Sequence, residues 1–232
     1  MPRGAPRGPV YRPLAWPFLL GLFLLLFLLA PFLLAGVSFA FGRVGIGART
    51  AYTLLVASLF GSFINIPLWR LPRREVAQTP VVSAFGVAWR VPLARQPART
   101  LLAVNVGGGV IPVGVSTWIL AHDARWPAAL AATAVVAALT NRLARPVKNL
   151  GIAVPALAPP LAAAAAALVF AGTAAAPAAF VAGTLGTLIG ADLLNLHKLS
   201  DIGAAVASIG GAGTFDGIFL AGVLGVILAT AL

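Results

Sequence analysis

Apolar residues follow one another in long runs along this sequence, and polar or charged residues gather in the stretches between them. A helix that crosses a hydrocarbon core of about 30 Å needs roughly 17 to 25 such residues. The fourth of the runs is the weakest candidate, because it is short and contains Thr133, Thr140 and Asn141. The runs cover residues 14–41, 48–69, 100–121, 126–141, 150–172, 177–196 and 209–231. The pattern predicts an all-α, polytopic integral membrane protein with seven transmembrane helices, which form a single transmembrane domain over residues 1–232.

The last half of the chain, residues 100–232, is rich in alanine and glycine. Small residues at short helical intervals allow the backbones of two membrane helices to approach closely. We therefore expect this part of the chain to form a tightly packed helical core. The glycines that point to close packing are Gly183, Gly186, Gly190, Gly213, Gly217, Gly222 and Gly225.

Composition supports a membrane protein. Hydrophobic residues make up 60% of the 232 residues and charged residues 9%, with a mean hydropathy of +1.00, whereas soluble domains carry about 25% charged residues. Cysteine is absent, which excludes disulfides and thiolate chemistry. His122 and His197 are far apart in the sequence, so we expect no metal site, and no motif indicates a cofactor.

The net charge of +11 indicates that the basic residues contact anionic lipid head groups. We do not expect them to bind nucleic acid. Thirteen of the sixteen basic residues fall on one side of the predicted membrane, and only Arg43, Arg49 and Arg125 fall on the other. The positive-inside rule then places the N-terminal residues 1–13 in the cytoplasm and the C-terminus on the outer side of the plasma membrane. The first run is too long for a signal peptide and lacks a small-residue cleavage pattern, so we expect a retained helix.

The largest predicted cytoplasmic loop, residues 70–99, contains the runs "PVVSAF" and "VAWRVPL" on either side of Gly86. Valine and aromatic residues around a glycine are typical of a β-hairpin. Two roles remain open for this loop. It either holds lipid head groups at the membrane interface through its arginines, or forms a hairpin that gates a substrate.

Two of the five acidic residues, Asp192 and Asp216, fall inside predicted spans, while Asp201 falls in the loop between them and is given no special role. A charged side chain inside a membrane usually faces a cavity, a partner or a substrate path. Asp192 lies near the cytoplasmic end of the sixth run and Asp216 near the cytoplasmic start of the seventh. Because these two helices are expected to be antiparallel neighbours, the two carboxylates are expected at similar depth, where they can meet.

Other polar and helix-breaking residues are predicted at the same depth. Asn105 precedes three consecutive glycines and Pro112, which predicts unwound backbone of the kind that lines a cavity. The prolines of "VPALAPP" predict an extended start for the fifth run. The sequence thus predicts one pocket that opens toward the cytoplasm and contains Asn105, Asn149, Pro155, Asp192, Thr214 and Asp216.

Three interpretations of the two aspartates remain open. They can share a proton and act as the catalytic pair of an intramembrane hydrolase, with a transmembrane peptide as substrate. They can instead carry a proton or a small cation in a transporter or channel, or they can be structural and hold the helices together. Membrane lipids are expected partners in each case.

Three motifs carry a family resemblance: "VPALAPP", "GTLGTLIGADLLNL" and "SIGGAGTFDGIFLAG", in this order within residues 45–232. They resemble the uncharacterised prokaryotic membrane family known as domain of unknown function 1614. The resemblance implies a polytopic membrane protein and no established activity.

A weaker likeness is to presenilin-type and prepilin-peptidase-type intramembrane aspartic proteases. It implies that Asp192 and Asp216 are a catalytic pair and that Pro155, Ala156 and Leu157 correspond to the presenilin P-A-L motif. The sequence departs from that pattern in three ways. Two residues separate Gly213 from Asp216 where the G-x-G-D motif has none, the P-A-L stretch precedes both aspartates, and the aspartates are only 24 residues apart.

Overall fold

The computed structural model describes residues 15–72, 81–84, 87–90, 99–147, 151–199, 206–211 and 217–232. The chain divides into two compact units, residues 1–36 and 37–232. Helix α1 (Ala15–Arg43) supplies the described part of the first unit and continues into the second. Its large apolar side chains, such as Phe23, Phe27 and Phe32, are exposed. The segment Leu19–Arg43 is long and apolar enough to cross a membrane.

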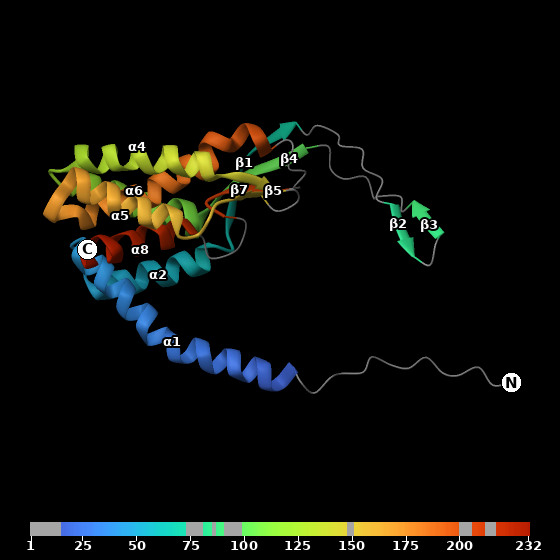
Figure 1. Ribbon diagram of the computed structural model, residues 1–232, viewed down its shortest axis with the longest axis horizontal. Coiled ribbons are helices and arrows are strands. Elements are labelled where there is room, and N and C mark those ends of the chain that lie inside the picture. Colours follow the sequence, from blue (N-terminus) through green and yellow to red (C-terminus); the bar gives the residue numbers. More distant parts are fainter. Residues whose placement is uncertain are drawn as a thin grey trace. The chain divides into compact units, whose positions relative to one another are not determined.

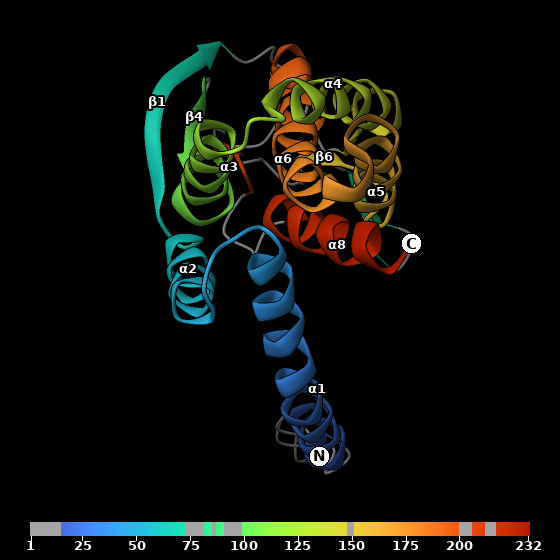
Figure 2. The same cartoon turned by 90° about the vertical axis from the view of Figure 1, so that its left-hand side faces the viewer.

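The second unit is built from helices that lie side by side, each antiparallel to the next along the chain (Figure 1). Helix α6 is the central one, because it contacts α3, α4, α5 and α8, as the end-on view shows (Figure 2). Eleven of its 13 residues are buried. The helices are α2 (Ala48–Gly61), α3 (Ile111–His122), α4 (Trp126–Leu143), α5 (Ala158–Ala171), α6 (Ala175–Thr187) and α8 (Gly217–Ala231).

Prolines and one glycine explain where several helices begin and end. Proline occupies the first turn of α4 and α5, where its missing N–H leaves no intrahelical hydrogen bond unmade. Helix α5 ends at Gly172, which has a φ of 57°, a value that favours glycine. The chain then turns back into α6. The apolar stretch Ala158–Lys198, which is long enough to cross a membrane, is therefore a helical hairpin.

Small residues allow the backbones around α6 to approach closely, as the sequence predicts. A Cβ atom added at Gly183 would lie 2.5 Å from the carbonyl oxygen of Ala221 in α8. Tight contacts also surround Gly186, Gly190, Gly222 and Gly225. Close packing is therefore confirmed at five of the seven glycines for which the sequence predicts it. Gly217 has open space around it, and Gly213 lies outside the described residues.

A three-stranded sheet lies at one end of the helices (Figure 1). Its order is β1-β4-β7, with β1 (Asn65–Pro72) antiparallel to β4 (Arg99–Asn105) and β7 (Val206–Ile209) parallel to β4. A second pair joins β5 (Arg145–Val147) to β6 (Gly151–Ala153). Strands β1 and β4 occupy parts of two runs that the sequence predicts as membrane helices, so these runs are part strand and part helix. Strand β6 lies at the start of the fifth run, where the prolines predict extended backbone.

Within the 70–99 loop, β2 (Val81–Ala84) pairs with β3 (Val87–Arg90) in antiparallel fashion. The pair lies where the valine-rich runs around Gly86 predict a hairpin.

Each of the seven predicted runs contains a helix, and the fold is mainly helical. Helix α4, in the run that looked weakest, is regular over 18 residues. There the hydroxyl of Thr133 donates a hydrogen bond to the carbonyl of Ala129 and so does not interrupt the helix. Helix α2 has 14 residues and spans about 21 Å, less than a hydrocarbon core of about 30 Å. Seven complete transmembrane crossings stay a prediction.

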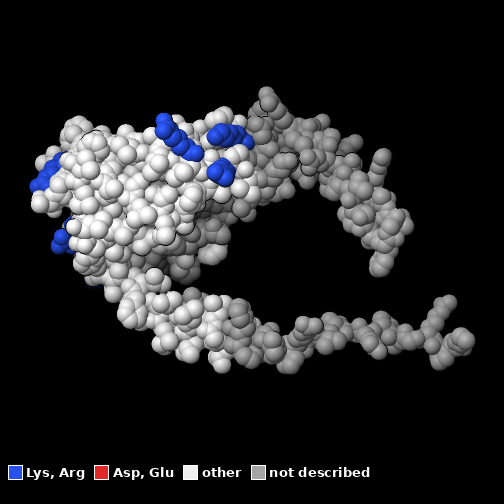
Figure 3. Space-filling model, viewed as in Figure 1, with Lys and Arg blue, Asp and Glu red and all other residues white. Residues whose placement is uncertain are grey.

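Charged and apolar side chains occupy different zones of the surface. On the face shown in Figure 3, Lys and Arg side chains gather over the two ends of the helices, and the described surface between them is uncharged. The outer faces of the helices expose large apolar side chains, among them Phe60, Val135 and Val169. Such a wide apolar surface is typical of a membrane protein.

Candidate functional site

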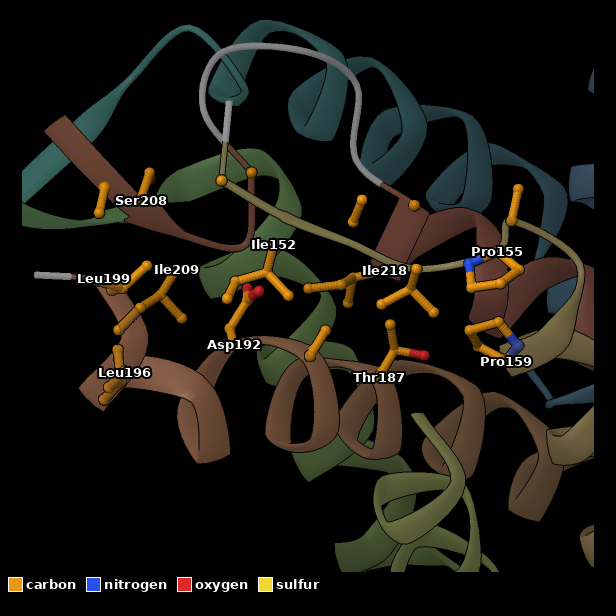
Figure 4. Close-up of a pocket in the computed structure, with 18 of the residues that line it drawn as sticks. Ile152, Pro155, Pro159, Thr187, Asp192, Leu196, Leu199, Ser208, Ile209 and Ile218 are labelled. Carbon is orange, nitrogen blue, oxygen red and sulfur yellow. The ribbon is translucent and has the colours of Figure 1, made fainter. Parts of the chain in front are cut away.

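A cavity of about 350 Å³ lies at the sheet end of the helices (Figure 4). Its walls come from β6, the start of α5, the end of α6, β7 and the start of α8. Most lining side chains are aliphatic or small, and the polar ones are Thr187, Asp192 and Ser208. The cavity is therefore an apolar chamber in which Asp192 is the one acidic residue among the described lining residues. The larger apolar lining residues are Ile152, Pro155, Pro159, Leu196, Leu199, Ile209 and Ile218.

Asp192 reaches the cavity because the helix widens just before it. Residues Leu188–Asp192 form a π-helical turn, η3, which continues α6, and the 3-10 turn η4 (Leu193–Lys198) follows. Single π turns inside α-helices are frequent at functional sites. The carboxylate of Asp192 points from this turn into the cavity, toward Ile152 (Figure 4).

One oxygen of the Asp192 carboxylate is held by the backbone. Its Oδ2 accepts a hydrogen bond of 2.7 Å from the N–H of Gly210, the residue that follows β7. Gly210 has a φ of 83° and packs so closely against Gly109 that no side chain would fit. Among the described residues, the other oxygen, Oδ1, has no hydrogen-bond partner.

The structure brings together two of the residues that the sequence predicts for the pocket. Pro155 and Asp192 line the same cavity. Asn149, Thr214 and Asp216 lie outside the described residues, so the distance between the two aspartates stays untested. Gly217, which directly follows Asp216, also lines the cavity.

Asn105 lies elsewhere and has a different environment from the one expected. It ends β4, is fully buried, and is not among the residues that line the cavity. Its Nδ2 donates hydrogen bonds to the carbonyl of Ser62 at 2.6 Å and to Oδ1 of Asn65 at 3.1 Å. Its Oδ1 accepts one from the N–H of Gly108 at 2.8 Å. Asn105 thus connects the end of α2 with two strands.

The glycines after Asn105 are also arranged differently from the prediction. They form a π-helical turn, η1 (Val106–Val110), that leads directly into α3. The backbone is therefore not unwound here. The Asn105 side chain caps this turn by accepting the hydrogen bond from Gly108, and the small residues let it pack against α2, where the hydroxyl of Ser58 donates to the carbonyl of Gly107.

Asn195 is a buried residue near the site that sequence reasoning missed. Its Nδ2 lies within 3.0 Å of three acceptors: the carbonyls of Gly190 and Ala191 and Oδ1 of Asn141. Its Oδ1 accepts a hydrogen bond of 2.6 Å from Lys198. A π turn displaces backbone carbonyls from their regular partners, and Asn195 satisfies two of them. The available signal was an asparagine three residues after Asp192 in a stretch of apolar residues.

No curated protein and no solved structure matches the chain. The model of one family, described as "Protein of unknown function (DUF1614)", matches residues 59–228. This range begins near the end of α2 and includes the sheet, the cavity and most of α8. The match confirms the resemblance carried by the three sequence motifs, and the chain belongs to the DUF1614 family.

Proposed function

We propose that this protein is a multi-pass protein of the prokaryotic plasma membrane, with its N-terminus in the cytoplasm and its C-terminus outside. Support comes from the exposed apolar side chains of the helices and from the charges at their ends. Arg142, Arg145 and Lys198 belong to the sheet end of the second unit, whereas Arg43, Arg49 and Arg125 belong to the opposite end. With the basic loops on the inside, the cavity lies near the cytoplasmic face.

We propose further that the cavity is the active site of a hydrolase whose substrate is a membrane peptide. Its catalytic groups are two aspartates of this chain, Asp192 and Asp216. The observation that carries this proposal is the setting of Asp192, whose carboxylate points into a largely apolar cavity and whose Oδ1 has no hydrogen-bond partner among the described residues. The chain neighbour of Asp216, Gly217, lines the same cavity, as does Pro155 of the P-A-L stretch.

The chemistry follows from two carboxyl groups that share one proton. The ionised carboxylate takes a proton from a water molecule as the water oxygen attacks the amide carbon, and the protonated carboxyl donates its proton to the carbonyl oxygen. The C–N bond of the tetrahedral intermediate then breaks as the carboxyl group that took the water proton donates it to the leaving nitrogen. The other carboxylate recovers its proton from a hydroxyl group of the intermediate as the new carboxylic acid forms. One peptide bond and one water thus give a carboxylic acid and an amine. Apolar walls favour a shared proton, because they disfavour two adjacent negative charges.

Cleavage of transmembrane peptides by the full-length protein in lipid nanodiscs tests this proposal. We expect Asp192→Asn and Asp216→Asn each to lower the cleavage rate by at least ~10²-fold, the usual contribution of an acid–base group. Asp123→Asn is the matched control. Asp123 lies in the α3–α4 turn, at the opposite end from the cavity, and accepts a hydrogen bond from the N–H of Arg125. Its replacement should leave the rate unchanged.

Two other results would replace the hydrolase proposal. A wild-type protein that cleaves no peptide but conducts protons or cations, with a flux that Asp192→Asn abolishes, would identify a transport site. A protein without either activity whose melting temperature falls sharply in Asp192→Asn would show a structural role.

A further inference from the structure

The cavity is lined by residues of two strands from different sheets. All four residues of β7 and all three residues of β6 line it. Strand β7 pairs with β4 along one edge, and among the described residues no strand pairs with its other edge. Strand β6 likewise pairs only with β5 in the described part of the chain. The cavity therefore combines residues of two strands, each paired along one edge in the described part of the chain, with aliphatic walls.

This combination restricts the kind of molecule that fits. An open strand edge offers backbone N–H and C=O groups, which are costly to leave unpaired in apolar surroundings. A lipid acyl chain satisfies the apolar walls and leaves those groups unpaired. A helical peptide has already used its own backbone groups. An extended peptide with small or aliphatic side chains meets both requirements. Its backbone pairs with the strand edge, and its side chains pack against the apolar walls.

The position of Asp192 relative to β7 indicates where such a peptide would react. Gly210, which donates its N–H to Asp192, directly follows Ile209, the last residue of β7. The carboxylate is thus held next to the Ile209 end of the strand, away from Val206. The cavity volume of about 350 Å³ is near the lower end of the ~300–1,000 Å³ typical of ligand pockets, so it encloses only a short piece of chain.

We propose that this site takes its peptide in extended form, as an added strand along the edge of β7 that lies opposite β4, with the reacting bond near Ile209. The inference rests on the proposed function for the identity of the ligand. It names the substrate class as an unfolded, uncharged segment with small and aliphatic side chains. A transmembrane helix must then unwind locally before it enters the site.

Photocrosslinking to peptides with altered backbones tests this inference in the full-length protein in nanodiscs. A photoreactive amino acid replaces Val206, which is exposed on β7, or Val169, which is exposed near the far end of α5 and does not line the cavity. The probe is a biotin-labelled peptide of alternating alanine, valine and leucine. Two control peptides carry N-methyl groups on the odd or on the even residues, which removes backbone donors and keeps every side chain.

We expect the position of Val206 to crosslink to the unmodified peptide and the position of Val169 not to do so. For at least one N-methylated peptide, the crosslinking yield should be lower than that of the unmodified peptide by about tenfold or more, because several backbone hydrogen bonds are lost. The Asp123→Asn protein, which is altered in the turn between α3 and α4 at the opposite end from the cavity, should crosslink as well as the wild type. Equal crosslinking of all three peptides, or none at Val206, would overturn the inference even if the protein cleaves peptides. Backbone-dependent crosslinking without any cleavage would instead uphold the strand-binding site and refute the hydrolase.

Discussion

The carboxylate of Asp192 and the backbone N–H of Gly210 lie 2.7 Å apart, and this hydrogen bond joins the π turn after α6 to the end of β7. Gly210 in turn packs against Gly109 in the π turn before α3. One contact thus connects the proposed catalytic group with the strand that we propose as its substrate guide. The geometry of the site should depend on this contact as well as on the charge of the carboxylate.

Two replacements of Asp192 separate the hydrogen bond from the charge. Asp192→Asn keeps an oxygen that can accept from Gly210, so its melting temperature should stay close to that of the wild type. Asp192→Ala leaves the N–H of Gly210 without its acceptor and should lower the free energy of unfolding by about 1–3 kcal/mol. Thermal unfolding in detergent measures both. Equal melting temperatures for the two variants would show that the hydrogen bond contributes nothing to stability.

Close packing of α6 against α8 predicts a strong effect for a single methyl group. In Gly183→Ala the new Cβ would lie 2.5 Å from the carbonyl oxygen of Ala221, so the two helices must separate, at a cost of about 1–3 kcal/mol. Gly114→Ala in α3 is the matched control, since no atom lies within 4 Å of its Cβ position. There alanine should stabilise the helix by about 0.5–1 kcal/mol. Unfolding in denaturant should give opposite signs, and a loss in both variants would contradict the packing argument.

Local patterns in the sequence predicted much of the helical fold. Run lengths located α1 and α4 to within a few residues, and glycine spacing located the contacts of α6. The strands of the main sheet escaped prediction, because a short apolar run does not distinguish a strand from a buried helix. Strand β4 also pairs with residues far away in the chain, such as Leu101 with Val206. Such pairings have no local signature.

The candidate site was predicted in part. Pro155 and Asp192 were assigned to one pocket because helix breakers and a carboxylate were expected at one depth, and both line the cavity. The same argument misplaced Asn105, because a polar residue beside glycines can cap a turn as well as line a cavity. Asn195 was missed because its role depends on a π turn, and the sequence pattern does not show where a helix widens.

Asn105 should matter for stability and not for ligand binding. Asn105→Asp replaces a donor with an acceptor beside the carbonyl of Ser62 and Oδ1 of Asn65, both of which are acceptors. It should lower the free energy of unfolding by about 3 kcal/mol or more, as expected for a buried charge without a partner. Asn65→Ala is a milder control, because Asn105 keeps its bonds to Ser62 and Gly108. Chemical unfolding should rank the two variants in this order, and the reverse order would refute the capping role.

The chain contains no cysteine, so single cysteines can report which end of the helices faces the cytoplasm. Ala124 lies in the exposed turn between α3 and α4, and Val147 is exposed at the end of β5, at the sheet end. Neither replacement removes a basic residue, so the charge distribution that is expected to orient the protein stays unchanged. The reagent is a maleimide that does not cross membranes. It is applied to cells whose plasma membrane is intact and whose outer envelope has been made permeable to the reagent.

Because the basic residues of the sheet end should remain in the cytoplasm, Ala124→Cys should react in such cells and Val147→Cys only after the plasma membrane is disrupted. Leu232→Cys should behave like Ala124→Cys, since α8 begins at the sheet end and ends at the opposite one. Reaction of Val147→Cys alone would invert the proposed orientation and place the Asp192 cavity on the outer side. Reaction of both positions in intact cells would mean that the α4 helix between them does not cross the membrane, which would contradict the predicted fourth span.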